Sequence, residues 1–225
     1  RERWEALTDG GWDSNTLEEL TAAMAAVSTL RASQDEEISA AATWVTARSI
    51  EFAVDQVPSR YYTSTMKRNL AVLLGNIPDE VAALAGGESL DRPDLYGLSG
   101  LVTDAQFETV LYRVIDDEHA AEALTSAMLQ YHHDRIDSQM PTAADPEATV
   151  LGQYQSAAQT MGYLDGIAEL HTNNNTAPDP ITPETAHEYI TWQRHVNDPT
   201  MDSIDHEMVN TKTGYDQGQA AKVTD

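Results

Sequence analysis

The sequence predicts an all-α fold, a bundle of about seven to eight helices followed by a C-terminal helical arm. Apolar residues recur at spacings of three and four in one segment after another, which is the period of a helix that buries one face. Capping residues, prolines and glycines separate these segments. No stretch alternates apolar and polar residues in the way that a half-buried strand does.

Two helices are predicted at the start of the chain. Ser14 is the expected cap of a helix over residues 15–30. Ser33 and Glu36 form a capping box for the next helix. That helix should end before Pro58, because proline disfavours helical backbone in the residue before it.

Two shorter helices are predicted next, over residues 64–75 and 78–85. Pro78 suits the first turn of the second one, and the glycine pair at residues 86–87 ends it. Residues 88–100 have no helical period and are predicted to form a loop. A loop of that length either serves the function or lies across the surface.

The longest periodic stretch, residues 103–140, is the expected centre of the bundle. Thr103 and Gln106 form a capping box and predict a helix start. The acidic run at residues 116–118 predicts a second start, because carboxylates complement the positive end of a helix dipole. Two helices with a turn near Asp116 should result. The core side chains expected here are Phe107, Val110, Leu111, Val114, Ile115, Leu124 and Met128.

The last helix of the bundle is predicted over residues 146–171, with a proline at its start. Gly152, Gly162 and Gly166 lie inside it. These glycines either allow a neighbouring helix to approach closely or weaken the helix by up to about 1 kcal/mol each. The core side chains expected on this helix are Val150, Leu151, Tyr154, Ala157, Ala158, Met161, Leu164, Ile167 and Leu170.

The composition changes after that helix, which predicts a domain boundary. Residues 1–171 form the predicted bundle, residues 172–182 an Asn/Pro-rich linker, and residues 183–225 a C-terminal helical arm with a frayed end. The arm carries a narrow apolar face, so we expect it to dock on the bundle or on a partner. The partner-binding candidates on this face are Tyr189, Ile190 and Trp192.

The charge and composition limit the partners. The chain has 37 acidic and 13 basic residues, a formal net charge of -24. Such a surface repels nucleic acids and anionic membranes, and no apolar run is long enough to span a bilayer. The acidity indicates either an adaptation to solubility or high salt, or a protein that blocks a basic partner. Because the acidic residues are spread along the chain, the first interpretation is favoured. The start at Arg1 predicts a fragment or a processed product.

Four residues are the candidates for catalysis or metal binding: Asp116, His119, His132 and His133. Asp116 and His119 are three apart, a spacing that a metal site on a helix can use. His133 and Asp137 are four apart and share a face in the same way. His132, however, should be half-buried at the edge of the apolar stripe, while His133 should point into solvent. We therefore expect no catalytic residue, no bound metal and no cofactor. The sequence also contains no HExxH, GxSxG or phosphate-loop motif.

Four helical segments follow one another in a recognisable order. AAATWVTARSIEFAVDQV leads into MKRNLAVLLGNIPDEVAALAGG, and after a loop come DAQFETVLYRVIDDEHAAEALTSAMLQYHHDRI and YQSAAQTMGYLDGIAEL. This order, over residues 11–171, resembles the C-terminal half of an uncharacterised helical domain family of large actinobacterial proteins. The family occurs beside type VII secretion components and polymorphic toxins. The resemblance implies a bacterial protein, in the cytoplasm or exported by a non-classical route, and it assigns no activity or catalytic residue.

These observations favour a non-enzymatic helical scaffold, or a trafficking or interaction domain, of a larger toxin-associated bacterial protein that is secreted or retained. A metal-dependent hydrolase that uses the His/Asp cluster is one alternative. An acidic inhibitor or immunity-type protein that binds a basic partner is another. A protein partner is expected in the favoured interpretation, whereas the oligomeric state stays open.

Overall fold

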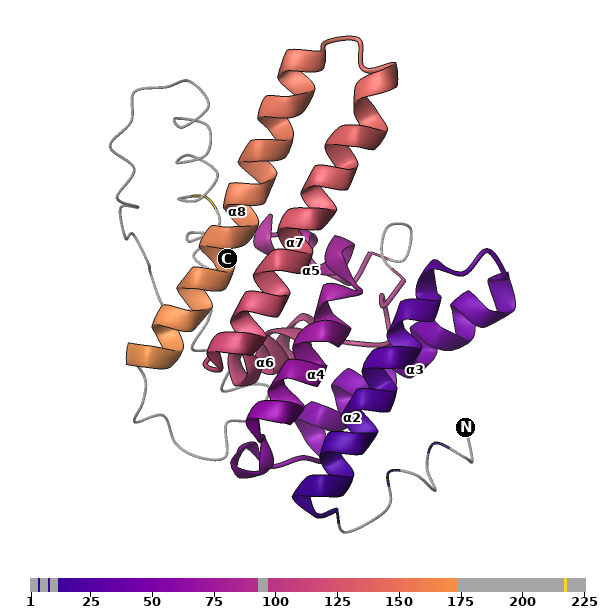
Figure 1. The fold of residues 1–225 in the computed structure, drawn as a ribbon, viewed down its shortest axis with the longest axis vertical. Helices are drawn as coiled ribbons and strands as arrows, with labels where there is room; N and C mark the ends of the chain where they lie inside the picture. Colours follow the sequence, from indigo (N-terminus) through magenta and orange to yellow (C-terminus); the bar gives the residue numbers. More distant parts are fainter. Residues whose placement is uncertain (1–3, 5–7, 9–11, 93–96, 174–216, 218–225) are drawn as a thin grey trace.

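The computed structural model describes Trp4, Thr8, residues 12–92, residues 97–173 and Gln217. These residues form seven α-helices and no strand, so the predicted all-α class is confirmed (Figure 1). Among them, no helix combines the length and the apolar character needed to cross a bilayer. The predicted linker and arm lie outside the described residues, apart from residues 172–173 and Gln217.

The helices follow the predicted order, and α7 and α8 form an antiparallel hairpin whose outer end extends beyond the other helices (Figure 1). The last helix ends at residue 173 rather than 171. The α-helices are α2 (Ser14–Ser28), α3 (Glu36–Asp55), α4 (Ser64–Gly75), α5 (Pro78–Ala85), α6 (Asp104–Val114), α7 (Glu118–Gln139) and α8 (Pro146–Asn173). Short 3-10 turns are η1 (Thr29–Ala32), η2 (Ser59–Tyr61) and η3 (Met140–Thr142).

The two helix starts predicted on the central stretch are confirmed. Thr103 Oγ1 accepts a hydrogen bond from the Gln106 backbone at 3.2 Å, and Gln106 Oε1 accepts one from the Thr103 backbone at 3.1 Å. This is the reciprocal pairing of a capping box. Asp117 caps α7 by accepting from the backbone N–H of Ala120 at 3.0 Å. The chain therefore turns between α6 and α7, as the acidic run predicts.

Two other predicted caps are wrong. Asp13, not Ser14, caps α2, and it accepts the Thr16 backbone N–H at 2.8 Å. Asp35, not the Ser33 box, caps α3 by accepting two backbone N–H groups of the first turn. An ionised carboxylate forms charge-assisted hydrogen bonds and also complements the helix dipole, so it is preferred here to a neighbouring hydroxyl group.

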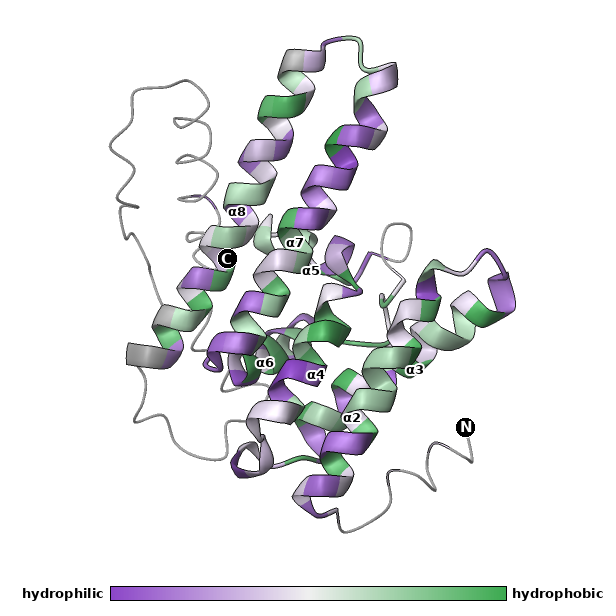
Figure 2. Cartoon of the chain, viewed as in Figure 1, coloured by the Kyte–Doolittle hydropathy of each residue, from purple (hydrophilic) through white to green (hydrophobic). Residues whose placement is uncertain are grey.

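The core contains buried side chains from all seven described helices, including the inner halves of α7 and α8 (Figure 2). Ten of the expected core side chains are buried, which confirms the register of α6, α7 and the second half of α8: Phe107, Val110, Leu111, Val114, Ile115, Leu124, Met128, Leu164, Ile167 and Leu170. The prediction is wrong for Tyr154 in the first half of α8, whose side chain is 44% exposed. Burial on α6 goes beyond its predicted apolar face. Every residue from Phe107 to Val114 is buried, including the polar residues Glu108, Thr109 and Arg113.

Arg113 connects α6 to the end of α3. Its Nη1 atom lies 3.0–3.2 Å from three carbonyl oxygens, those of Ala53, Val54 and Val57. The Tyr62 hydroxyl donates a hydrogen bond to the first of these carbonyls. The last carbonyl groups of a helix have no N–H donor within the helix, and they lie at the negative end of its dipole. The buried guanidinium group supplies both the donors and the positive charge that this end requires.

Glycine has opposite roles at two positions. A Cβ atom on Gly75, at the end of α4, would lie 2.8 Å from the Cβ atom of Ala127 on α7, so the close packing of these helices requires glycine there. Gly152 has open space around its Cα atom. The sequence predicts either that Gly152 allows a neighbouring helix to approach closely or that it weakens its own helix. The structure supports the second alternative.

We predict that the same substitution changes stability in opposite directions at these two sites. Gly75→Ala should lower the free energy of unfolding by about 1–3 kcal/mol, because α7 has to move away. Gly152→Ala should raise it by about 0.5–1 kcal/mol through helix propensity. Urea denaturation of both variants measures the two effects. A Gly75→Ala variant as stable as the unmodified chain would show that the α4–α7 contact is looser than described.

Candidate functional site

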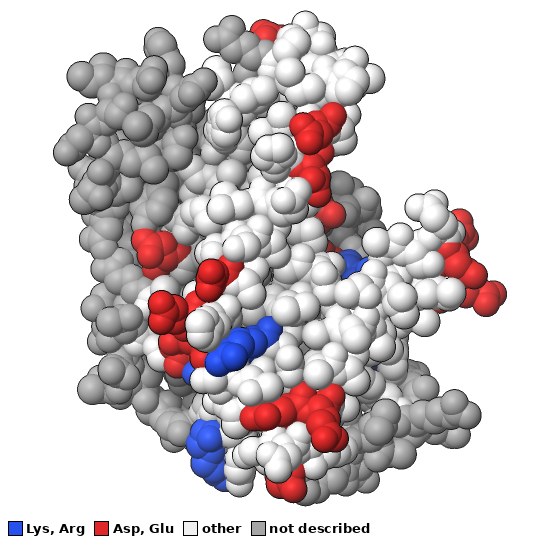
Figure 3. Space-filling model, viewed as in Figure 1, with Lys and Arg blue, Asp and Glu red and all other residues white. Residues whose placement is uncertain are grey.

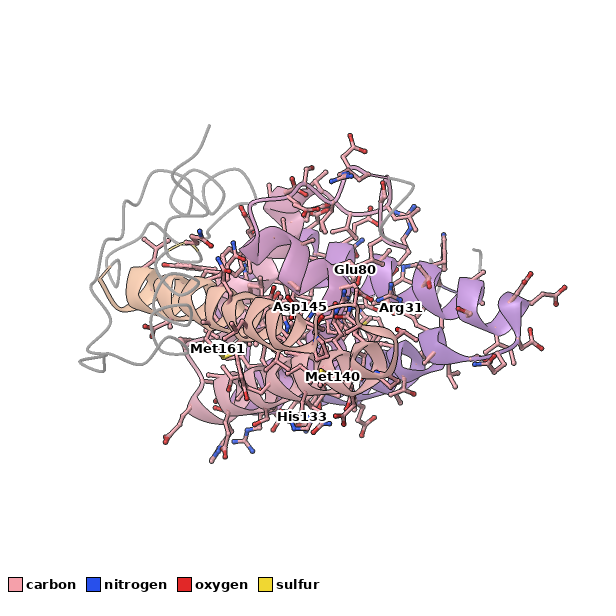
Figure 4. All side chains as sticks on the ribbon, turned by 90° about the horizontal axis from the view of Figure 1, so that it is seen from above. Arg31, Glu80, His133, Met140, Asp145 and Met161 are labelled. Atoms are coloured by element: carbon pink, nitrogen blue, oxygen red, sulfur yellow. The ribbon has the colours of Figure 1, made fainter. Side chains whose placement is uncertain are left out.

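Two of the four candidate residues lie on the outer surface of α7. The side chains of His119 and His133 are 63% and 71% exposed. His133 Nδ1 lies 3.7 Å from Asp137 Oδ2, so this pair does share a helix face. Figure 4 shows His133 on the side of α7 that points away from α8. Both histidines are accessible to water and lack enclosing groups.

Asp116 has different neighbours from those that its spacing predicts. It precedes the cap of α7 and so does not share a helix face with His119. Its Oδ1 lies 2.5 Å from Lys67 Nζ, and its Oδ2 lies 3.5 Å from His171 Nε2. Burial lowers the pKa of His171, and although Asp116 opposes that shift, Lys67 adds to it. The carboxylate therefore connects α4, the α6–α7 turn and the end of α8.

His132 is buried, and more deeply than its position at the edge of the apolar stripe predicts. It is 4% exposed, because α8 covers it. Its Nε2 atom lies 3.2 Å from Thr160 Oγ1 on α8. Burial lowers the pKa of His132, which outweighs a hydrogen-bonding effect of Gln153 that raises it. The ring is therefore neutral near pH 7.

The four candidates thus do not converge on one site. Within the part of the chain that the structure describes, no group of three or more His, Asp or Glu side chains is placed to hold a metal ion. The partner-binding candidates Tyr189, Ile190 and Trp192 lie outside the described residues.

A polar pocket lies beside His132, between α5, α7 and α8. Its volume is about 270 Å³. The side chains that define its chemistry are Asp79, Tyr131, His132, Arg135, Gln153 and Gln159.

Three of these side chains form a network at the mouth of the pocket. The Tyr131 hydroxyl donates to Asp79 Oδ1 at 2.5 Å and accepts from Arg135 Nη1 at 2.7 Å. The Arg135 guanidinium also lies over the Tyr131 ring, 5.4 Å from its centroid. Burial and the adjacent Asp79 carboxylate raise the pKa of Tyr131, so the phenol keeps its proton. This network orients polar groups without activating a nucleophile.

Few features of the sequence indicate this pocket. Tyr131 and Arg135 are four apart on one helix, which predicts their contact. Asp79 is more than fifty residues away in the chain from both, and Thr160 is 28 residues from His132. Only the packing of α5 and α8 against α7 brings these groups together.

Comparison with known proteins gives a family but no relative of known function. Residues 1–196 match the model of a family described as a family of unknown function, DUF6571. No curated protein and no solved structure matches the chain. The matched family has no assigned function, in agreement with the uncharacterised family that the sequence resembles. The match shows no link to secretion or toxins. It also runs to residue 196, past residue 171, where the resemblance described above ends.

We predict that His132 makes the stability pH-dependent. Its pKa is lower in the folded chain than the ordinary value of 6.5. The unfolded chain therefore binds more protons, and the stability that neutral His132 provides is present above pH 6.5 and is lost as the pH falls below it. His132→Asn should remove this part of the pH dependence, and His133→Asn, at an exposed position, should not. Urea denaturation between about pH 5 and 8 measures both. Parallel pH curves for the unmodified chain and His132→Asn would contradict the assignment.

Proposed function

The chain belongs to the DUF6571 family of unknown function, and on that premise we propose that it is a non-enzymatic helical interaction domain. The part that we assign to a partner is the outer end of the α7–α8 hairpin. This end extends beyond the other described helices (Figure 1). The inner half of the same hairpin is packed into the core.

The observation that carries the proposal is the exposure of large apolar side chains along the outer half of this hairpin, from the middle of α7 to the tip and back onto α8. Leu129 on α7 is 51% exposed, Met140 at the tip is 37% exposed, and Tyr154 on α8 is 44% exposed. Exposed apolar residues are ordinary when single, but a set of them on one projecting element is typical of a binding surface. Tyrosine and methionine are also enriched in the cores of protein interfaces.

The charges near these side chains favour a particular kind of partner. Asp134, Asp137 and Asp145 are exposed on the same part of the hairpin. Acidic side chains also outnumber basic ones on the face shown in Figure 3. A partner that has an apolar patch bordered by lysine or arginine complements this surface, and the charges would speed association at low salt. The proposal therefore includes the basic partner of the inhibitor alternative.

The hydrolase alternative has less support. It requires Asp116, His119, His132 and His133 to act together, and these side chains have separate surroundings. His132 already has a structural partner in Thr160.

Two wider parts of the proposal rest on the sequence alone. The first is that this domain belongs to a larger, toxin-associated bacterial protein, which rests on the resemblance of its helical segments. The second is that Tyr189, Ile190 and Trp192 of the C-terminal arm add to the partner surface, which rests on the apolar pattern of that segment. Gln155 Nε2 on α8 donates to Gln217 Oε1 at 3.0 Å, so a residue beyond the arm helix does reach the hairpin.

We predict that replacing Leu129, Met140 and Tyr154 together by serine weakens partner binding at least about tenfold, because apolar anchors supply most of the binding energy of an interface. The candidate partners are the proteins encoded next to this chain, purified one at a time. Isothermal titration calorimetry gives the dissociation constant, and raising the salt concentration should increase it.

The matched control replaces three other exposed apolar residues, Leu30, Ile38 and Val72, which are exposed to a similar extent on α2–α4 and the turns between them. This variant should bind as the unmodified chain does. Equal loss in both variants, or no binding by any neighbour, would contradict the proposal. Loss only on truncation after residue 173 would place the interface on the arm instead of the hairpin.

A further inference from the structure

The outer half of the α7–α8 hairpin has two different faces. Successive side chains of an α-helix point about 100° apart, so the residues that join the two helices set the direction of all others. His132 on α7 contacts Thr160 on α8. Gln139 on α7 accepts a hydrogen bond from Gln153 on α8. Measured from these contacts, one face of the hairpin carries the side chains that line the polar pocket beside α5: Tyr131, Arg135, Ser156 and Gln159.

The opposite face of the hairpin is apolar. Because α7 and α8 are antiparallel (Figure 1), the same geometry directs large apolar side chains from both helices to this side. Three of them are the exposed residues of the proposed interface, Leu129, Met140 and Tyr154. Two more, Ile136 and Val150, are half-buried between them. These five residues form the apolar face, and the line of contact between α7 and α8 runs along its middle.

The backbone of the hairpin limits what can bind to the apolar face. The N–H groups inside a helix are already used, and the described residues contain no strand whose edge could pair with an extended segment. A polyproline segment binds a groove lined by aromatic residues, and Tyr154 is the one aromatic residue of the five. An α-helix satisfies its own backbone and binds through side chains alone, so it is the element that fits this surface.

We propose that the apolar face binds an amphipathic α-helix of another protein, with lysine or arginine beside its apolar stripe. This inference rests on the proposed function, because it names the kind of partner that the same hairpin binds. Leu129 and Met140 are 11 positions apart along α7. That distance is about 17 Å, or three helical turns. A partner helix of about four turns with apolar residues at i, i+3, i+4 and i+7 covers it.

The charges beside the apolar face favour a basic partner. Residues 129–154 include four acidic residues and one arginine. That arginine, Arg135, lies on the pocket face and contacts Asp79. Asp137 on α7 and Asp145 at the turn are exposed. A second copy of this chain would bring the same acidic residues and be repelled, whereas a basic helix complements them.

The test is an NMR titration of the full chain with a peptide of about 14 residues, which has leucine at i, i+3, i+4 and i+7 and lysine elsewhere. One matched peptide has proline at its centre, which breaks the helix. The other has glutamate in place of every lysine. We expect saturable shifts of the backbone amide signals of Leu129, Ile136 and Tyr154 with the first peptide. The other two should bind at least about tenfold more weakly.

Two protein variants locate the binding face. Leu129 and Gln130 are both exposed, and their side chains point about 100° apart. Leu129→Lys places a charge on the apolar face and should weaken binding of the leucine–lysine peptide roughly tenfold. Gln130→Lys adds the same charge outside that face. It should weaken binding much less at physiological salt, where the charge alone is screened.

Several results would overturn the inference. Equal binding of the proline peptide would show that no helix is needed, and equal loss in both lysine variants would show that charge alone drives binding. Displacement of the Trp192 indole signal by the peptide would assign the face to the arm of this chain. A dimer that the peptide dissociates, detected as faster diffusion, would assign it to a second copy.

Failure of this inference is distinguishable from failure of the proposed function. A neighbouring protein that binds the chain but not the triple serine variant, with no binding of the leucine–lysine peptide, would retain the proposed interface and exclude a basic helix as its partner. Peptide binding that Leu129→Lys weakens, with no neighbouring protein bound, would support the helix-binding face and contradict the proposed function.

Discussion

The fold depends on the contact of the Arg113 guanidinium with the C-terminal carbonyls of α3. Taking a charge out of water is costly, and here three carbonyl groups and the negative end of a helix dipole offset the cost. The contact holds α6 inside the bundle, where every residue from Phe107 to Val114 is buried. Because the α6–α7 turn follows directly, the position of α6 sets the direction of α7. Lys67 on α4 holds that turn through Asp116.

This direction explains why the hairpin has two different halves. Its inner half passes over α4 and α6 and buries Leu124 and Met128. Its outer half extends past the other described helices (Figure 1), and Leu129, Met140 and Tyr154 are exposed there. The polar pocket lies at the boundary, where α5 is the last element to reach the hairpin. The proposed interaction surface and the polar pocket thus both lie on a hairpin that extends beyond the helices it packs on.

The parts of this structure that depend on neighbours in the chain could be predicted from the sequence, and those that depend on distant contacts could not. The Thr103–Gln106 box and the core register of α6 and α7 follow from local spacing. Asp13 and Ser14 can both cap a helix. The prediction of Ser14 is wrong because the charged carboxylate of Asp13 is the stronger cap. The burial of His132, the Asp79–Tyr131 contact and the role of Arg113 all join residues 28 to 60 positions apart. The spacing of apolar residues in the sequence does not indicate contacts between residues so far apart. The candidate pocket could therefore be found only from the structure.

The unfolding free energy of Arg113 variants tests the central structural claim most directly. Arg113→Met fills a similar volume but removes this donor from the buried carbonyl groups of Val54 and Val57 and leaves that of Ala53 with the Tyr62 hydroxyl. We therefore predict a loss of about 3 kcal/mol or more in urea denaturation. Arg113→Lys keeps the charge but not the planar fork, so its loss should be smaller. An Arg113→Met variant that is as stable as the unmodified chain would show that apolar packing alone positions α6, and that the contact with α3 does not hold the fold together.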